Sequence, residues 1–570
     1  MMIHPDDASG GEICFLLDVN WLGMEYRFST VPIDLIDAQT NQTFRYNGGL
    51  GDPSVDQQTE FVGFNIDANS VSLDLTWNDI DWIAEWKQGR SLDLADAELS
   101  MIIVKDGSTL FKYEDRVQLF TGKVKDPIIG TPTKPTGNII FSIENSTNLI
   151  QKKLLDNSFE IDPFVFPGLD QRAATLGKII DVPVGQYVPF VFGQVGKWPL
   201  RSSGSARFET ISEAKVTPAY IIDATGSGAA IEITLIIAMG EVGASRIRIF
   251  DDAGGNFVNN VSTALNADGH RYAFTTYKLG HVIEDNSFVP GLDEDQTFWC
   301  SWGEFGEGIQ DPLTGQSLSG GGNLSIFCLE RSGLEYNREA WIGLLPVLNR
   351  YKFAGFMNDP SVLVMDWYRQ NIAKNLPIEV FPGEKGIEPR LNLYFTQDQI
   401  RPQHHILESG MFEVQTGLQP LPVDPINKVT IKYCYTARLD HYLASICIDP
   451  EHTGNQDPFV QRDPVSDLSF SRFGLREVVM ELPFVWDLHT AYRIARDRIR
   501  ISGLGAFGVE VFAFPQFGYL QIGDVISFTS TNLQLDAHKC QIVGKSWSGG
   551  KWRFVLHMEE NTMVNARQLA

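Results

Sequence analysis

The feature that most constrains the fold is a β-strand signal that recurs at both ends of the 570-residue sequence. In SVSLDL (70–75), Val71, Leu73 and Leu75 alternate with polar residues, so they lie on one face of an extended chain. Far along the chain, Gly549-Gly550 separates two strand-like segments by the two residues that a tight hairpin loop needs. Both regions are therefore predicted to form antiparallel β-sheet.

The second of these patterns gives a register. A two-residue loop at Gly549-Gly550 places Ser548 opposite Lys551 and Trp547 opposite Trp552. It also places one set of apolar residues on a single face of the last strand, namely Trp552, Phe554, Leu556 and Met558.

The stretch GYLQIGDVISFTS (518–530) is predicted to be strand, turn and strand. Ile526 and Phe528 then point to one face. Asp524 directly follows Gly523, and the pair is predicted to form the turn rather than a catalytic site.

Because 570 residues exceed what one hydrophobic core accommodates, we predict several domains and a mainly β (β-rich α+β) fold class. The segments are 12–150, with strands and one short helix at 79–88; 151–204, a structured connector; 205–345, a β-rich insertion; 346–424, an α+β unit; and 425–560, strands with one helix. Candidate strands of the insertion are 230–238, 245–251, 270–276 and 324–329.

Three helices are predicted in more detail. In the short helix at 79–88, Ile80, Ile83 and Trp86 are expected to face inward. Asp359-Pro360 is expected to open a second helix, whose stripe of Val364, Trp367, Tyr368 and Ile372 is assigned to core packing. Asp487 is expected to cap a third helix, 488–501, with Leu488, Tyr492, Ala495 and Ile499 inward.

The charge balance argues against a protein that grips nucleic acid. The chain has 71 Asp and Glu against 46 Lys and Arg, a net charge of −25, which repels DNA and anionic membranes at long range. Such a charge suits solubility, or a surface past which DNA slides. The six cysteines form no CxxC pair, so neither a zinc site nor a disulfide framework is indicated, and reduced thiols in a cytoplasm are expected. No secretory signal and no membrane-spanning segment are predicted.

The motifs that resemble catalytic or cofactor sites do not meet the structural context that those sites require. GLGAFG (503–508) matches GxGxxG, but a helix precedes it and a strand-like segment follows, which reverses the order of a dinucleotide site. His404-His405 diverge as neighbours and make a poor metal pair. Paired acids such as Asp251-Asp252 and Glu559-Glu560 are expected by chance in an acidic chain. We predict no catalytic residue, no metal ligand and no cofactor.

One concentration of positive charge stands out. Arg493, Arg496 and Arg500 form a stripe along the predicted helix 488–501. Such a stripe can meet phosphates, but acidic partners are abundant in this chain, so we favour a salt-bridged contact between subunits or between domains.

Four stretches, taken in order, resemble the central tail hub, or baseplate hub, of tailed bacteriophages and gene transfer agents. They are FRYNGGLGDP (44–53) with SVSLDL and LFTGKVKDP (119–127); VPFVFGQVGKWPL (188–200); NKVTIKYCYT (427–436); and the series LHTAYRIARDRIR (488–500), YLQIGDVISFT (519–529), VGKSWSGGKWRFVLHM (543–558). The resemblance covers about half of the chain, and the insertion 205–345 has no counterpart in it.

The resemblance implies a structural virion protein and no enzyme. Hubs of this kind are homotrimers in which each subunit supplies two barrels related to the tail-tube protein, here 12–150 and 425–560. Three chains then make a pseudo-sixfold ring that adapts the sixfold tail tube to a threefold tail tip and lines the DNA channel. The implied partners are the distal tail protein ring, tail fibres or a spike, the tape measure protein, and genomic DNA that passes without specific binding. The implied location is the tail tip of a virion assembled in the host cytoplasm.

Two alternatives remain at this point. The chain is a tail-associated hydrolase of the cell wall, with the insertion as its module, or a tail protein that binds a host-surface glycan or receptor. The second alternative would use Trp299, Trp302 or Trp341, provided that these side chains are exposed.

Overall fold

The computed structural model describes residues 11–58, 70–77, 80, 82–105, 111–131, 134–144, 152–169, 185–193, 199–201, 208–210, 217–226, 232–240, 247–251, 254–258, 262–265, 267, 269, 271–278, 298–301, 318–383, 386–393, 404–407, 412–414, 416–420, 424–437, 440–452, 459–548 and 550–559. Strands dominate these residues and form several separate sheets, which confirms the predicted mainly β, multidomain fold class. No helix among them is long and apolar enough to cross a membrane.

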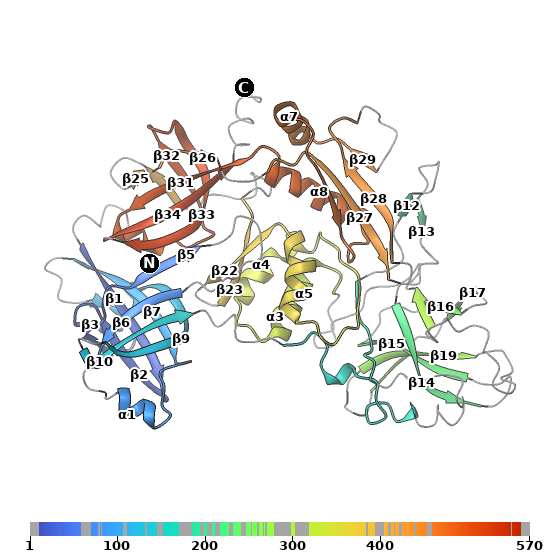
Figure 1. Ribbon diagram of the computed structural model, residues 1–570, viewed down its shortest axis with the longest axis horizontal. Helices are drawn as coiled ribbons and strands as arrows, with labels where there is room; N and C mark the ends of the chain where they lie inside the picture. The colour runs from blue at the N-terminus through green and yellow to red at the C-terminus, as the bar shows by residue number, and fades with distance from the viewer. Residues whose placement is uncertain are drawn as a thin grey trace.

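The N-terminal part of the chain folds into a barrel (Figure 1, blue). Its elements are β1 (Gly11–Trp21), β2 (Met24–Ser29), β3 (Ile33–Ile36), β4 (Thr43–Gly48), β5 (Ser54–Gln58), β6 (Ser70–Thr76), α1 (Trp82–Lys87), β7 (Asp96–Lys105), β8 (Phe111–Lys112), η2 (Tyr113–Asp115), β9 (Val117–Thr131) and β10 (Lys134–Glu144). Antiparallel pairing runs β2–β1–β7–β9–β10–β6. The strict alternation predicted for 70–75 is confirmed, because Val71, Leu73 and Leu75 are all buried.

Residues 49–51 close this barrel. The Leu50 amide donates to the Ser29 carbonyl of β2 (3.2 Å), and the Gly51 amide donates to the Asp74 carbonyl of β6 (2.7 Å). Gly49 has a φ of +123°, and a Cβ there would lie 2.4 Å from the Thr76 carbonyl oxygen. Glycine is therefore required where the FRYNGGLGDP segment passes between β2 and β6.

The C-terminal strands, named here the C-terminal sheet, stand against the barrel and are hydrogen-bonded to it (Figure 1, red). Its elements are β24 (His404–Leu407), β25 (Phe412–Val414), β26 (Gln419–Pro420), β31 (Ala506–Ala513), η8 (Pro515–Tyr519), β32 (Val525–Ser530), β33 (Leu535–Ser548) and β34 (Lys551–Glu559). β24 pairs with β32 in parallel, and the antiparallel order β32–β33–β34–β31 follows. The predicted register is confirmed: Trp547 pairs with Trp552 and Ser548 with Lys551.

A central unit built mainly of helices lies beside both sheets (Figure 1, yellow). It contains α3 (Gly321–Ser332), α4 (Arg338–Leu348), α5 (Val364–Asn371), η7 (Ala373–Asn375) and the hairpin of β22 (Ile378–Gly383) and β23 (Gly386–Leu391). The connector reaches it through β11 (Phe190–Phe192), which pairs with β21 (Gly355–Met357), and also holds η4 (Asn157–Phe159). The stripe assigned to core packing on α5 is confirmed, since its four side chains are at most 2% exposed: Val364, Trp367, Tyr368 and Ile372.

The insertion forms a seven-stranded sheet in the order β17–β16–β20–β14–β15–β19–β18 (Figure 1, green). The strands are β14 (Thr217–Thr225), β15 (Glu232–Met239), β16 (Ile247–Asp251), β17 (Gly254–Val258), β18 (Ser262–Leu265), β19 (Arg271–Lys278) and β20 (Phe298–Ser301). A separate short ladder joins β12 (Pro199–Arg201) to β13 (Phe208–Thr210).

Residues 428–502 form a unit of their own, although the sequence analysis places them with the strands that follow. β27 (Lys428–Thr436), β28 (His441–Ile448), β29 (Val460–Gln461) and β30 (Glu477–Glu481) make a four-stranded sheet in the order β29–β28–β27–β30. The helices α7 (Pro464–Phe473) and α8 (Leu488–Ser502) belong to the same unit. The C-terminal sheet instead recruits β24, β25 and β26 from before this unit.

Three local predictions are wrong. Residues 324–329 lie in α3 and are no strand. Asp359 does not cap α5, which begins at Val364; its carboxylate accepts from the Ser361 amide (2.8 Å) and holds a turn. On α1, Ile83 and Trp86 are 41% and 62% exposed and do not face inward as predicted. Ile80, which lies just before the helix, packs against the barrel core.

Candidate functional site

The junction of the N-terminal barrel with the C-terminal sheet is the first candidate site. β5 pairs antiparallel with β33 through Gln58 and Gly544, Gln57 and Lys545, and Asp56 and Ser546. One hydrophobic core runs through both parts, with Phe15, Leu73 and Phe141 on the barrel side and Val511 and Phe554 on the other. The two regions are thus one folding unit made from segments far apart in the sequence.

Lys545 lies in this junction. Its side chain is 2% exposed, its Nζ donates to the Gly518 carbonyl (2.7 Å), and the ammonium stands 4.7 Å from the Trp552 ring centre. Burial lowers the pKa of Lys545 to about 7, although the nearby Asp524 carboxylate favours the charged form. No pattern in the sequence singles out Lys545, because a lysine in a strand that alternates in polarity is normally taken as exposed.

Asp524 forms the predicted turn, since its carboxylate accepts from the Gln521 amide (2.8 Å). Gly523 supplies a φ of +88°, and a Cβ there would lie 2.5 Å from the Phe381 ring of β22. Asp524 also forms an ion pair with Arg390 of β23 (3.7 Å). The turn therefore fastens the C-terminal sheet to the central unit, a role that the sequence pattern does not indicate.

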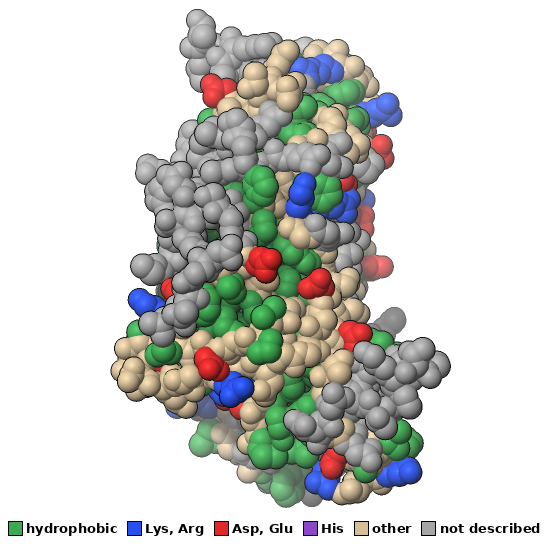
Figure 2. Space-filling model, turned by 90° about the vertical axis from the view of Figure 1, so that its left-hand side faces the viewer, with side chains coloured by type: hydrophobic (Ala, Val, Ile, Leu, Met, Phe, Trp, Pro, Cys, Tyr) green, Lys and Arg blue, Asp and Glu red, His purple; other side chains and the backbone are tan. Residues whose placement is uncertain are grey.

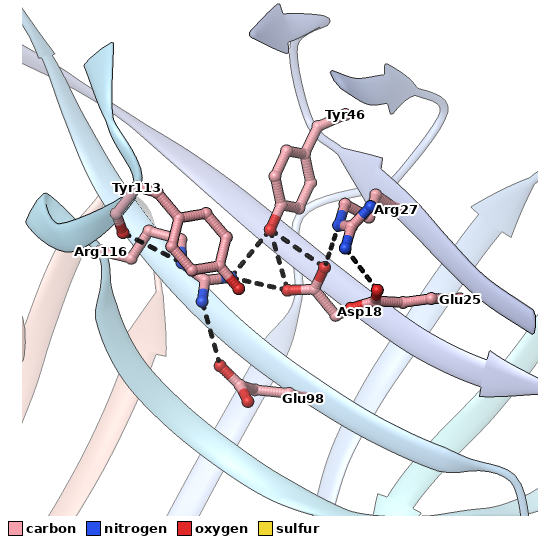
Figure 3. Close-up of polar contacts among 7 residues, drawn as sticks. All are labelled: Asp18, Glu25, Arg27, Tyr46, Glu98, Tyr113 and Arg116. Carbon is pink, nitrogen blue, oxygen red and sulfur yellow. Dashed lines mark hydrogen bonds and ion pairs between the residues drawn. The ribbon is translucent and has the colours of Figure 1, made fainter. Parts of the chain in front are cut away.

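A second candidate site is a charged cluster on the N-terminal barrel (Figure 3). The Tyr46 hydroxyl donates to Asp18 (2.9 Å to Oδ2), and the Arg116 guanidinium donates to the same oxygen (2.7 Å) and to the Tyr46 hydroxyl (2.8 Å). Arg27 lies on the other side of Asp18, 3.3 Å from Oδ1, and Glu98 lies 3.8 Å from Arg116.

Burial dominates the electrostatics of this cluster. It raises the pKa of the Asp18 carboxyl, while Arg116, Tyr46 and Arg27 oppose the rise. Tyr113 packs its ring 3.6 Å from the Arg116 guanidinium carbon. The arrangement joins β1, β2 and β4 to the residues that follow η2, and Asp18, Tyr46 and Arg116 hydrogen-bond one another, so it resembles a structural clamp rather than a reactive site.

The predicted arginine stripe lies on α8, whose N-terminal cap is Asp487 as expected. Arg493 donates to the Arg350 carbonyl of the central unit (2.5 Å), and Arg496 forms an ion pair with Asp463 at the cap of α7 (3.3 Å). Arg500 acts on the nearby Asp497 carboxylate and favours its charged form. The subunit-contact role proposed for this stripe stays a prediction.

The remaining sequence motifs gain no chemical role. In GLGAFG, α8 ends at Ser502 and β31 begins at Ala506, which is the predicted helix-to-strand order. Trp341 is fully buried and donates to the Ile387 carbonyl (3.2 Å), so it is no surface for a glycan. The side chains of His404, His405, Trp299 and Trp302, and the paired acids, lie outside the described residues.

Among the described residues, no group of three or more His, Cys, Asp or Glu side chains could hold a metal ion. On the side of the molecule formed by the two sheets, Lys and Arg side chains stand singly or in small groups between acidic and hydrophobic ones (Figure 2). The described part of that side shows no continuous basic tract.

No protein-family model and no curated protein sequence matches the chain. Solved structures that are similar include the tail protein from Neisseria meningitidis MC58 (10% identity, 96% of each chain covered, TM-score 0.36). They also include the 43 kDa tail protein of prophage MuSo2 from Shewanella oneidensis (8% identity, 97% and 100% covered, TM-score 0.36). A third is from the virion of a native gene transfer agent (11% identity, 70% and 92% covered, TM-score 0.36). Likeness at this level establishes neither a shared family nor a shared activity.

Proposed function

We propose that this protein is a structural subunit of a tailed-virus or gene-transfer-agent tail, and that it forms a trimeric hub at the tail tip. The observation that carries the proposal is the pairing of β5 with β33, which joins the N-terminal barrel and the C-terminal sheet into one unit with a common core. A chain that holds two such β units side by side offers six of them in a trimer. Three copies therefore suit an adaptor between sixfold and threefold symmetry.

The sequence resemblance supports the same proposal, and its segments have definite structural roles. FRYNGGLGDP closes the N-terminal barrel at residues 49–51, and YLQIGDVISFT supplies the turn at Asp524 that meets the central unit. In this proposal the C-terminal sheet serves as the second tube-like barrel. The helical central unit, which contacts the C-terminal sheet at the Asp524 turn, and the insertion would lie outside the tube wall and be available to fibres, a spike or a host-surface glycan.

The net charge of −25 fits a channel through which DNA passes without adhering, because like charges repel and no counterions are released on contact. We propose that part of this charge lines the bore of the ring.

The deciding experiment is a cryo-EM map of the native particle, with light scattering of the purified full chain as a first step. We expect three copies at the end of the tail tube, six β units around the lumen, and acidic side chains facing it. In solution the expected mass is three times the 63.7 kDa of one chain. A particle with a copy number other than three, or with this chain outside the tail tip, contradicts the hub; a neutral or basic bore contradicts only the charge proposal.

A further inference from the structure

A small pocket lies between α8 and the segment that follows α5. Its volume is about 80 Å³, and it is lined by Ile378 and Leu376 on one side and by Ile494 and Ile501 of α8 on the other. This volume accommodates a group of side-chain size and is too small for a drug-sized ligand. The pocket belongs to neither candidate site described above.

Two cations stand together at this pocket. The Arg498 guanidinium donates to the backbone carbonyl of Lys374 (2.9 Å), and both residues line the pocket. Burial lowers the pKa of both, and Arg498 lowers that of Lys374 further by repulsion. The Asp497 carboxylate attracts Arg498 and favours its charged form, and Lys374 is solvent-exposed. An anion that enters the pocket would be attracted by both cations.

Asp497 also lines the pocket and offsets part of its positive charge. Its carboxylate accepts a hydrogen bond from the Tyr351 hydroxyl (2.6 Å) and is shared among Arg500, Arg496 and Arg498 of the same helix. Two positive groups against one negative group leave the pocket net positive. α8 as a whole carries four arginines and one aspartate, within a chain of net charge −25.

Asn375 contributes an independent signal. The side chain is 5% exposed and lines the pocket, its Nδ2 donates to the Asn371 carbonyl (2.9 Å), and its Oδ1 has no hydrogen-bond partner. The bond from Nδ2 fixes the orientation of the amide, so the unpaired atom is the acceptor. A buried acceptor without a partner indicates a donor that comes from elsewhere.

We propose that this pocket binds a glutamate side chain presented by another polypeptide. The carboxylate would lie between Lys374 and Arg498, the methylene groups would contact the isoleucine walls, and a neighbouring N–H of the bound chain would donate to Asn375 Oδ1. An acidic peptide supplies all three features together. A second copy of this chain is a suitable source, because acidic residues outnumber basic ones by 71 to 46.

The test uses the full chain with ¹³C-labelled isoleucine methyl groups and N-acetylglutamate N-methylamide as the probe. We expect saturable shifts of the Ile494 and Ile501 methyl signals, assigned through Ile494→Val and Ile501→Val. The uncharged glutamine analogue should give none. Arg498→Gln and Lys374→Gln should each weaken binding about tenfold. Lys87→Gln on α1 is the matched control and should bind the probe like the wild type.

The proposal is overturned if the wild type shows no shift, or if the glutamine analogue binds as well as the glutamate probe. Glucuronate tests the other anionic source, and binding of glucuronate at lower concentration than the peptide probe would overturn the peptide assignment in favour of an acidic glycan. Because the probe is monovalent, the result does not depend on oligomeric state. Failure here is therefore distinguishable from failure of the hub proposal.

Discussion

Lys545 places an ammonium group in an apolar environment, and this gives the protein a pH dependence that can be predicted. In the folded protein burial lowers the pKa of Lys545 to about 7 from its ordinary value of 10.5, so between these two pH values the unfolded chain holds more protons than the folded one. Stability therefore rises with pH across that window, and the penalty is fully present below pH 7.

Replacement of this lysine removes the effect. Between pH 7.5 and 9, the unfolding free energy of the wild type should rise relative to that of Lys545→Met. The expected rise is up to about 1.4 kcal/mol for each pH unit. The measurement is urea unfolding at a series of pH values. Parallel pH profiles for the two proteins would show that the ammonium is not buried as described.

The Tyr46 hydroxyl connects Asp18 to Arg116, and its removal leaves both with one partner fewer in a buried setting. We expect Tyr46→Phe to destabilise the barrel by roughly 1.5–3 kcal/mol, the range for hydrogen bonds to charged groups. Tyr113→Phe is the control, because that residue meets Arg116 with its ring and backbone carbonyl; we expect a change of less than about 0.5 kcal/mol. Equal effects in the two variants would contradict the assigned role of the hydroxyl.

The sequence predicts the structural role of a single residue only when the partners of that residue are close to it along the chain. Asp487, Asp524 and the Trp547–Trp552 pair are all predicted correctly, because a cap, a turn and a two-residue hairpin involve neighbours along the chain. Asp18 and Arg116 are 98 positions apart, and strand alternation indicates the face of a side chain but not the strand that will lie beside it.

At the scale of elements, the same limit applies to the pairing of β5 with β33. The hairpin at Gly549-Gly550 predicts β33 as a strand, whereas β5 is not predicted individually and nothing in either segment indicates its partner. Likewise, the unit of β27–β30 with α8 interrupts the strands of the C-terminal sheet, and a linear reading of 425–560 merges the two. Turn residues indicate which neighbouring strands pair. They do not indicate the order in which strands from distant segments are added to a sheet.

The β5–β33 pairing is open to a direct test by disulfide formation. Asp56 pairs with Ser546, and opposed residues of antiparallel strands have Cα atoms about 4.5–5.5 Å apart, within the range that a disulfide spans. Asp56→Cys with Ser546→Cys should crosslink under mild oxidation, as peptide mass spectrometry would detect. Asp52→Cys with Ser546→Cys is the control and should not crosslink, because Asp52 precedes β5 by two residues. Crosslinking in both pairs, or in neither, would contradict this register.

For the whole molecule, sequence composition and strand patterns were sufficient to predict a mainly β chain of several domains with a β-rich insertion. They were not sufficient for the helical content of the central unit, where α3 takes residues whose apolar pattern suits a strand equally well. The pocket beside α8 was not predictable either. Its lysine, asparagine and arginine come from two units whose contact depends on the complete tertiary arrangement.

The common core of the N-terminal barrel and the C-terminal sheet also affects biosynthesis. A ribosome releases β5 long before it makes β33, so during most of translation one edge of the barrel has its backbone donors and acceptors uncovered. Nascent chains stalled between the two strands should therefore bind chaperones or aggregate through this edge. Slow elongation in the intervening segment would be expected to lower the yield of native protein.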